Sequence, residues 1–267
     1  MTDELRAPTS RAAFLRKGAV AGAGLAVAAG LPGTALAKGL RMGSGLTAGD
    51  VDILNAAAIA EALAVTTYTG IIDTAPFFKN LASDDQGYLK SARDEEMSHY
   101  LLEVGATKTQ SPFTTFYYPK GMFTDAQTTL NTLVTLEDAF IAAYLVGVRN
   151  FSTAALRVTA ARIMGIESDH RTLARVVAPG VAKADGGPVE MITGVLGKAE
   201  SVDPPNNTGY ERTLKWTKIS QAVAALTPFA DKATAAKAGF DTTKPYVFKQ
   251  FTPMLPNPLG AFHSFAG

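Results

Sequence analysis

Glu96-Met97-Ser98-His99 and Glu167-Ser168-Asp169-His170 are the two stretches that decide the fold of this chain. In each of them a histidine follows a glutamate by three residues, and a helix places residues i and i+3 on the same face. One predicted helix before each pair, a lone glutamate interrupts an apolar stripe, and these glutamates are Glu61 and Glu137. The order Glu, Glu-x-x-His, Glu, Glu-x-x-His is typical of a site for two metal ions in a four-helix bundle.

The charge of this residue set indicates metal binding. Four carboxylates in one core would repel one another and would lose their hydration, unless cations neutralise them. Two divalent ions carry four positive charges and balance the set. A single Glu-x-x-His pair is more often a solvated surface pair, so the hypothesis depends on the complete pattern. The predicted ligands are Glu61, Glu96, His99, Glu137, Glu167 and His170.

The apolar residues around these ligands have helical spacing, which predicts four long helices. Sequences that resemble capping boxes open the first three helices at Thr47, Ser83 and Thr124. The fourth helix is expected to start at Ser152 and to end before Pro179. Each helix carries its ligand glutamate at mid-length, so the four glutamates can meet at one level of a bundle.

The lengths of the connections predict the topology. Asn150 and Phe151 leave room only for a tight turn, so the third and fourth helices must be antiparallel neighbours. A modest loop over residues 74–82 joins the first two helices, and a long segment over residues 105–123 joins the two pairs. The expected fold is therefore all-α, with two antiparallel helical hairpins joined by one long crossover.

Two tyrosines repeat the symmetry of the ligands. Tyr68 follows Glu61 by seven residues, and Tyr144 follows Glu137 by the same interval. We expect both tyrosines to lie two helical turns from the ligand layer, where they could donate a hydrogen bond to a ligand or intercept a radical. The alternative is that each is a core tyrosine whose hydroxyl has found some other partner.

The last third of the chain shows weaker patterns. A short helix is expected over residues 187–200 and a fifth long helix over residues 213–226, ending before Pro228. The final stretch alternates prolines with aromatic residues, which favours an irregular strap packed on the bundle. We therefore assign residues 47–178 to the bundle and residues 179–267 to a C-terminal helical and irregular extension, without a second domain.

Composition excludes several classes of function. The 267 residues are 47% apolar and 18% charged, with a net charge of +1, so no basic field exists to attract nucleic acid. The chain has no cysteine, which excludes disulfides, thiolate zinc sites, Fe–S clusters and a lipoprotein anchor. An oxygen-rich shell with one nitrogen per ion suits Fe(II) or Mn(II) more than a structural zinc site.

The first 37 residues have the character of an export signal. A basic segment, Ser10-Arg11-Ala12-Ala13-Phe14-Leu15-Arg16-Lys17, precedes a Gly/Ala-rich stretch and a small-residue cleavage site at Ala35-Leu36-Ala37. The basic segment resembles a twin-arginine (Tat) signal in which Ala12 replaces the second arginine, so general secretion is the alternative route. An uncleaved anchor is a further alternative, but the apolar stretch is shorter than the roughly 20 residues that span a bilayer.

The ligand pattern Glu61, Glu96-x-x-His99, Glu137, Glu167-x-x-His170 resembles that of the ferritin-like superfamily, which includes bacterioferritins, rubrerythrins and manganese catalases. The long crossover, the C-terminal extension and the leader are most similar to the exported ferritin-like family that includes desiccation-related proteins. The resemblance implies that Glu96 and Glu167 bridge two metals, with Glu61 and Glu137 as terminal ligands. It also implies export to the periplasm, the cell envelope or the exterior of a bacterium, with no membrane span after cleavage.

Two main functions follow from this resemblance. In the first, the protein is a di-iron oxidoreductase, of ferroxidase or peroxidase type, which oxidises Fe(II) with dioxygen or peroxide. In the second, it is a non-enzymatic stress or desiccation-related protein whose metals are structural. Peroxide disproportionation at a di-manganese centre is a further alternative. The sequence leaves open the catalytic residues, the metal and whether the chain forms homo-oligomers.

Overall fold

The computed structural model describes residues 46–176, 179–181, 190–191 and 214–254, and these residues belong to one compact unit, Pro32–Leu255. The expected export signal over residues 1–37 lies outside the described residues, as does His263 in the expected C-terminal strap. Most of the short helix expected over residues 187–200 also lies outside them.

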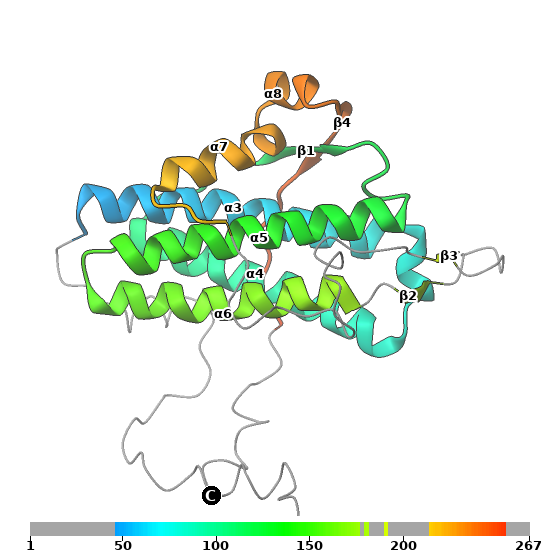
Figure 1. Ribbon diagram of the computed structural model, residues 1–267, viewed down its shortest axis with the longest axis horizontal. Helices are drawn as coiled ribbons and strands as arrows, with labels where there is room; N and C mark the ends of the chain where they lie inside the picture. The colour runs from blue at the N-terminus through cyan, green and yellow to red at the C-terminus, as the bar shows by residue number, and fades with distance from the viewer. Residues whose placement is uncertain (1–45, 177–178, 182–189, 192–213, 255–267) are drawn as a thin grey trace, which may run out of the picture. The chain divides into compact units, whose positions relative to one another are not determined.

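Four long helices form the body of the protein. They are α3 (Ala48–Thr74), α4 (Ser83–Thr107), α5 (Ala126–Asn150) and α6 (Ala154–Val176). The closest packing is between α3 and α4 and between α5 and α6, and α3 also packs on α5. Figure 1 shows the four helices side by side along the long axis of the molecule. The prediction of two helical hairpins joined by a crossover is therefore confirmed.

The starts of the helices agree only in part with the capping boxes expected from the sequence. Thr47 caps α3 as predicted, since its hydroxyl accepts from the Asp50 N–H and the Asp50 carboxylate accepts from the Thr47 N–H. The expected cap at Thr124 was wrong by one residue, because Asp125 accepts from the Thr128 N–H at 2.7 Å. An aspartate oxygen serves this role as well as a threonine hydroxyl does.

The other two expected starts were also displaced. Ser83 is the first residue of α4 and not its cap, because Ala82 holds the cap position and makes no side-chain hydrogen bond there. Thr153 accepts from the Leu156 N–H at the start of α6. Ser152 instead donates from its backbone N–H to Asp50, at 2.8 Å, and this bond ties the α5–α6 turn to the start of α3.

The connections within each hairpin are compact. A 3-10 helix, η1 (Pro76–Asn80), joins α3 to α4. Between α5 and α6 the chain turns at Phe151, whose N–H donates to the Gly147 carbonyl at 2.9 Å. A Cβ on Gly147 would lie 2.8 Å from the Phe151 ring, so the glycine permits this close return of the chain.

A two-stranded sheet was not predicted from the sequence. Strand β1 (Thr115–Pro119), within the crossover, pairs antiparallel with β4 (Phe240–Val247), where an irregular strap was expected. A proline lacks the N–H of a ladder bond but is tolerated where only one side of a strand is paired, as at Pro245. Phe116 and Tyr118 of β1 are buried against the bundle. The sheet therefore fastens the crossover and the C-terminal region to one another.

The expected fifth helix is displaced toward the C-terminus. Helix α7 (Ile219–Ala230) packs on α3 and α5, and it continues past Pro228, which we expected to end it. The proline stands in the last turn of the helix, and only two helical residues follow it. A short helix that we did not predict, α8 (Lys232–Lys237), follows it.

A second short sheet lies in the described part of the region between α6 and α7. It consists of β2 (Pro179–Val181) and β3 (Glu190–Met191). The helix expected over residues 187–200 was therefore wrong at its two described residues, and its other residues lie outside the described part of the chain.

The buried apolar residues form two clusters, which extend mainly in opposite directions from the predicted ligand layer along α3, α5 and α6, while on α4 the larger cluster lies on both sides of the layer. On α3, Leu54 of the smaller cluster precedes Glu61 and Leu63 of the larger cluster follows it. The order is reversed on α5, where Leu136 precedes Glu137 and Tyr144 follows it. The glutamates thus occupy a polar layer between two apolar ones.

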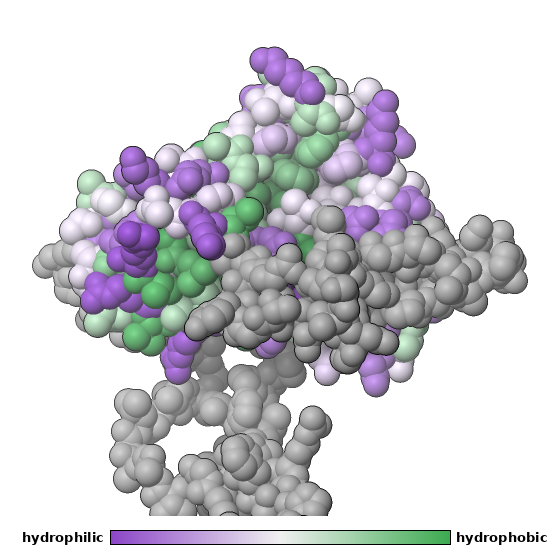
Figure 2. Space-filling model, viewed as in Figure 1, coloured by the Kyte–Doolittle hydropathy of each residue, from purple (hydrophilic) through white to green (hydrophobic). Residues whose placement is uncertain are grey.

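Helix α5 is long and apolar enough to cross a membrane by length and composition alone. However, 72% of its apolar window is buried inside the protein. This burial is what the core helix of a bundle requires. On the face shown in Figure 2, hydrophobic side chains gather over the end of the bundle where α5 meets α6, with charged side chains around them.

Candidate metal centre

The six predicted ligands come together in the middle of the bundle. Glu61 lies on α3, Glu96 and His99 on α4, Glu137 on α5, and Glu167 and His170 on α6. The four glutamates and His170 are at most 3% exposed. His99 is less deeply buried, and its side chain is 11% exposed. One layer of the core therefore holds four carboxyl groups and two imidazoles.

These side chains form two overlapping groups of four. The first, which we call the Glu61 half-site, consists of Glu61, Glu96, His99 and Glu167; the second, the Glu137 half-site, consists of Glu96, Glu137, Glu167 and His170. Within each group, ligand atoms from all four residues lie within 4.8 Å of one another. Glu96 and Glu167 belong to both groups, so each of them can offer one oxygen to either side.

The two histidines face carboxylates on other helices through the same ring nitrogen. His99 Nδ1 lies 3.1 Å from Glu167 Oε1 and 3.6 Å from Glu61 Oε2. His170 Nδ1 lies 2.8 Å from Glu96 Oε1 and 3.5 Å from Glu167 Oε2. The Nδ1 atom of each histidine therefore points into the carboxylate layer from opposite sides.

Burial and crowding change the protonation of this layer. Burial raises the pKa of Glu61 and Glu137 well above the usual range, and the neighbouring Glu96 carboxylate raises both further. Burial acts to lower the pKa of His99 and His170. The carboxylates beside them, chiefly Glu61 and Glu96 respectively, outweigh burial and raise both pKa values well above the usual range. Without metal ions, the layer therefore holds several protons.

The carboxylate oxygens fit divalent cations. Among the described residues, Glu61 Oε2, Glu137 Oε2 and both oxygens of Glu167 are buried and accept no hydrogen bond, and all but Glu137 Oε2 lie 3.1–3.6 Å from a histidine Nδ1. A buried acceptor without a hydrogen bond is costly, and hard divalent ions are natural partners for carboxylate oxygens. The cluster therefore suggests that this core binds divalent metal ions.

Each of the two predicted tyrosines contacts a glutamate from the opposite hairpin. Tyr68 on α3 donates from its hydroxyl to Glu137 Oε1 on α5 at 2.7 Å. Tyr144 on α5 contacts Glu61 on α3 through its hydroxyl. Burial raises the pKa of both tyrosines well above the usual range, and the neighbouring carboxylates raise it further, so both hydroxyls stay protonated.

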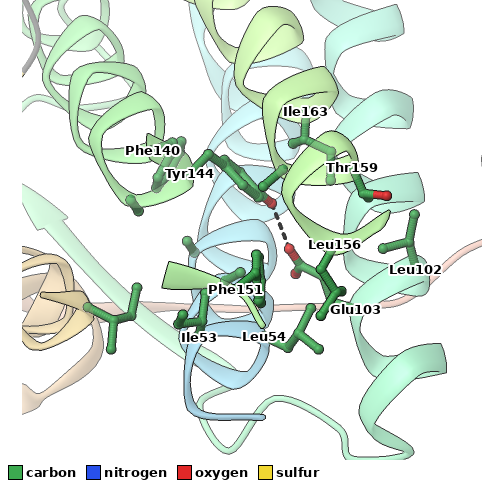
Figure 3. Close-up of a pocket in the computed structure, with 15 residues that line it drawn as sticks. Ile53, Leu54, Leu102, Glu103, Phe140, Tyr144, Phe151, Leu156, Thr159 and Ile163 are labelled. Carbon is green, nitrogen blue, oxygen red and sulfur yellow. Dashed lines mark hydrogen bonds between the residues drawn. The ribbon is translucent and has the colours of Figure 1, made fainter. Parts of the chain in front are cut away.

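Our sequence analysis missed a fifth buried glutamate. Glu103 is 1% exposed, and its Oε1 lies 2.6 Å from the Tyr144 hydroxyl (Figure 3). The signal was present, because Glu103 follows Glu96 by seven residues and His99 by four, and so shares their helix face.

The contacts of Tyr144 require a proton on one of the two carboxyl groups beside it. Its hydroxyl carries one hydrogen but lies in hydrogen-bonding contact with both Glu61 and Glu103. One of these two carboxyl groups must therefore hold a proton and donate it to the phenol oxygen. The raised pKa of Glu103, caused first by burial, agrees with a neutral acid at this position.

Glu95, the residue before Glu96, contacts a predicted ligand. Its side chain is 34% exposed. Its Oε2 nevertheless lies 2.8 Å from His170 Nε2, on the side of the ring opposite Nδ1. A carboxylate in this place orients the ring and fixes which nitrogen carries the proton. Asp169, the other acid that flanks a motif, is exposed.

Comparison with known proteins agrees with the fold and with the buried cluster. Residues 49–179 match the family model of the ferritin-like domain, and this range contains all six predicted ligands. No curated protein matches the chain significantly. The helical bundle, the layer of carboxylates and histidines in its core and the family match agree with one another, and residues 49–179 form a ferritin-like domain.

Proposed function

We propose that this protein binds a pair of iron ions in its bundle core and oxidises Fe(II) with dioxygen or peroxide. The observation that carries the proposal is the pair of overlapping ligand groups that share Glu96 and Glu167. A bound Fe(II) pair supplies two electrons, which reduce peroxide to water or dioxygen to peroxide. Manganese remains the alternative metal, because the same oxygen-rich set suits Mn(II).

The protein's own residues would hold the ions and manage the protons. Glu96 and Glu167 would each offer one oxygen to either ion, because each already faces both half-sites. His99 and His170 would bind through Nδ1, the nitrogen that faces the carboxylates. Tyr68 and Tyr144 would keep Glu137 and Glu61 in place by hydrogen bonding, and the protons now held by the layer would leave as the ions enter.

We also propose that the chain is exported from a bacterial cell, as its N-terminal sequence suggests. An exported protein meets metal ions and oxidants outside the cytoplasm. A non-enzymatic role in stress or desiccation is the second candidate function, and the buried carboxylate layer favours it to the extent that metal ions would stabilise the bundle.

A titration of the metal-free protein tests the proposal. We expect wild type to bind two Fe(II) ions per chain without oxygen and then to oxidise them, with two irons consumed for each peroxide or dioxygen. The double variant Glu96→Ala/His99→Ala should lose this reaction. Asp84→Ala/Lys90→Ala is the matched control, since it removes one acid and one cation from exposed positions on the same helix.

The outcomes separate the candidate functions. Equally slow oxidation by wild type and by the double variant would refute the oxidase. Loss of thermal stability on chelation, with no turnover of dioxygen or peroxide, would support a structural role for the metals. Repeated release of dioxygen from peroxide by the manganese-loaded protein would support the catalase-like alternative. Metal analysis of protein from its native compartment identifies the ion.

A further inference from the structure

A small apolar cavity lies inside the bundle next to the ligand layer. Each of the four helices lines it with a residue about one helical turn from a predicted ligand, namely Ala57, Glu103, Phe140 and Ile163. Figure 3 shows Tyr144 and Glu103 pointing toward one another in this cavity, with Leu156 and Ile163 of α6 and Leu54 of α3 around them. The cavity therefore ends at Tyr144, which contacts Glu61, and at Glu103, which contacts Tyr144.

The cavity is small and almost wholly apolar. Its free volume is about 20 Å³, and a cavity needs roughly 10–15 Å³ to hold one water-sized molecule. Of its fifteen lining residues, only Glu103, Tyr144 and Thr159 carry polar side chains, and the Tyr144 hydroxyl is already engaged. The cavity therefore suits one small molecule that needs few hydrogen bonds.

A second cavity adjoins the first and reaches the surface beside α7. It has a volume of about 70 Å³ and shares Ala60, Ala143 and Ile219 with the first cavity. Its lining also includes Phe113 and Val223, which are 41% and 43% exposed. The two shared alanines belong to α3 and α5, and their small side chains line both cavities. We call these two adjoining cavities, which extend from beneath α7 toward Glu103, the apolar passage.

We propose that these two cavities admit and hold dioxygen, so that dioxygen and not peroxide is the oxidant that reaches the metal centre by this passage. Peroxide and hydrated cations form strong hydrogen bonds with water, which apolar walls cannot replace, so their entry would be costly. Dioxygen is small, uncharged and weakly hydrated, and it loses little on entering. The inference deepens the proposed function by naming its oxidant.

The opposite approach to the ligand layer is polar. The side chain of Glu95 is 34% exposed and contacts His170, and the side chain of His99 is 11% exposed. Both lie on α4, whereas the outer cavity of the passage is lined chiefly by α3, α5 and α7 and by no residue of α4. Cations and peroxide, which need charged groups or hydrogen bonds, would enter more easily on the α4 side. The two kinds of reactant would therefore use separate routes.

The occupancy of the cavities can be measured on metal-free protein. Dissolved dioxygen is paramagnetic and speeds the relaxation of methyl groups near it, and xenon shifts the resonances of the apolar cavities that it fills. We expect both gases to affect the methyl groups of Ile53, Leu54 and Ile163. The fully buried Leu89 and Leu130, which line neither cavity, are the internal controls. Equal responses in both sets would overturn the proposal.

A matched pair of surface variants tests the passage in the iron-loaded protein. Val223 lines the outer cavity, while Val158 is 57% exposed on α6 and lines neither. We expect Val223→Phe to slow oxidation by dioxygen about fivefold and to leave oxidation by peroxide unchanged. Val158→Phe should change neither rate. Equal slowing of both oxidants in Val223→Phe, or slowing of neither, would overturn the passage.

The two experiments also keep this inference separate from the proposed function. If wild type binds iron but oxidises none of it, the proposed function fails, while the relaxation of the cavity methyl groups still decides whether dioxygen enters. If iron is oxidised but the methyl groups show no dioxygen, the cavities are not its route and the proposed function stands.

Discussion

The two half-sites have equivalent ligands but unequal surroundings. Seven residues after Glu96, on the Glu61 side, stands Glu103, while seven residues after Glu167 stands the buried Ala174. The Glu61 half-site therefore has a second carboxyl group behind its tyrosine. In the Glu137 half-site, Tyr68 is bonded to Glu137 alone among the described residues.

For the histidines, it is the Glu137 half-site that has the additional carboxyl group. His170 is supported at Nε2 by Glu95, whereas the residue in the equivalent position before Glu167 is Ile166, which has no group to offer His99. The Glu61 half-site thus has an additional acid, Glu103, that can hold a proton without being a ligand. In the Glu137 half-site, Glu95 holds the ligand His170 in place. We infer that the two metal ions differ in affinity and in ease of reaction, although their ligands are of the same kinds.

The largest expected effect is on the pH dependence of stability without metal. The pKa values of Glu61, Glu103 and Glu137 are raised, as are those of both histidines. These groups stabilise the fold below their unfolded values of 4.5 and 6.5, and the stability is lost as the pH rises through the folded values. Glu96 has a lowered pKa, and its contribution is lost only in strong acid.

Between pH 5 and pH 8 the metal-free protein should therefore lose several kcal/mol of unfolding free energy, at about 1.4 kcal/mol per proton and pH unit. The metal-loaded protein should lose little, because the ions replace the protons. Denaturant titrations at several pH values, with and without chelator, measure both. Glu103→Gln should lower the slope of unfolding free energy against pH by the equivalent of about one proton. This variant tests whether the extra acid belongs to the Glu61 half-site alone. An unchanged slope would contradict the comparison.

A smaller difference is expected between the two tyrosines. Tyr144→Phe removes a hydroxyl that two carboxyl groups share, and Tyr68→Phe removes one that serves a single carboxylate. In the metal-loaded protein, where ions replace the protons on Glu61 and Glu137, we expect losses of unfolding free energy of about 3 and about 2 kcal/mol respectively, since hydrogen bonds to charged groups contribute about 1.5–3 kcal/mol each. Tyr100→Phe, which removes a bond to the neutral Gln110, is the control and should cost about 1 kcal/mol. Equal losses for Tyr144 and Tyr68 would show that Glu103 adds nothing.

The smallest expected effect concerns one metal ion only. Glu95→Gln should weaken one of two Mn(II) binding steps about tenfold, because a carboxylate behind a metal-binding histidine typically contributes that much. Asp169→Asn changes the exposed acid of the other motif and should leave both steps as they are. Isothermal titration resolves the two steps. If Glu95→Gln weakens both equally, the half-sites are not independent in the way that the structure suggests.

Much of the bundle could be predicted because its signals are local. The helical spacing of apolar residues predicted α3 to α6, and the short turn at Asn150 and Phe151 predicted the antiparallel pairing of α5 with α6. The pairing of β1 with β4 was missed because its two strands lie more than a hundred residues apart. No local pattern marks such a partnership, and the proline of β4, Pro245, argues against a strand.

The gathering of the six predicted ligands followed from the same helical periodicity, whereas the contacts around them did not. Periodicity alone places Glu61, Glu96, Glu137 and Glu167 at mid-helix, where the helices of a bundle must meet. That Glu103 contacts Tyr144, and that Glu95 contacts His170, depends on the rotation and the offset of neighbouring helices.

The amino-acid sequence by itself determined the helices, their order and the chemical character of their shared layer, because each is set by residues close together in the chain. The tertiary structure alone decided which oxygen faces which nitrogen, how the two half-sites differ and where the apolar cavity lies. These features arise from side chains on different helices, and small shifts between packed helices change such contacts without changing the pattern of any one helix.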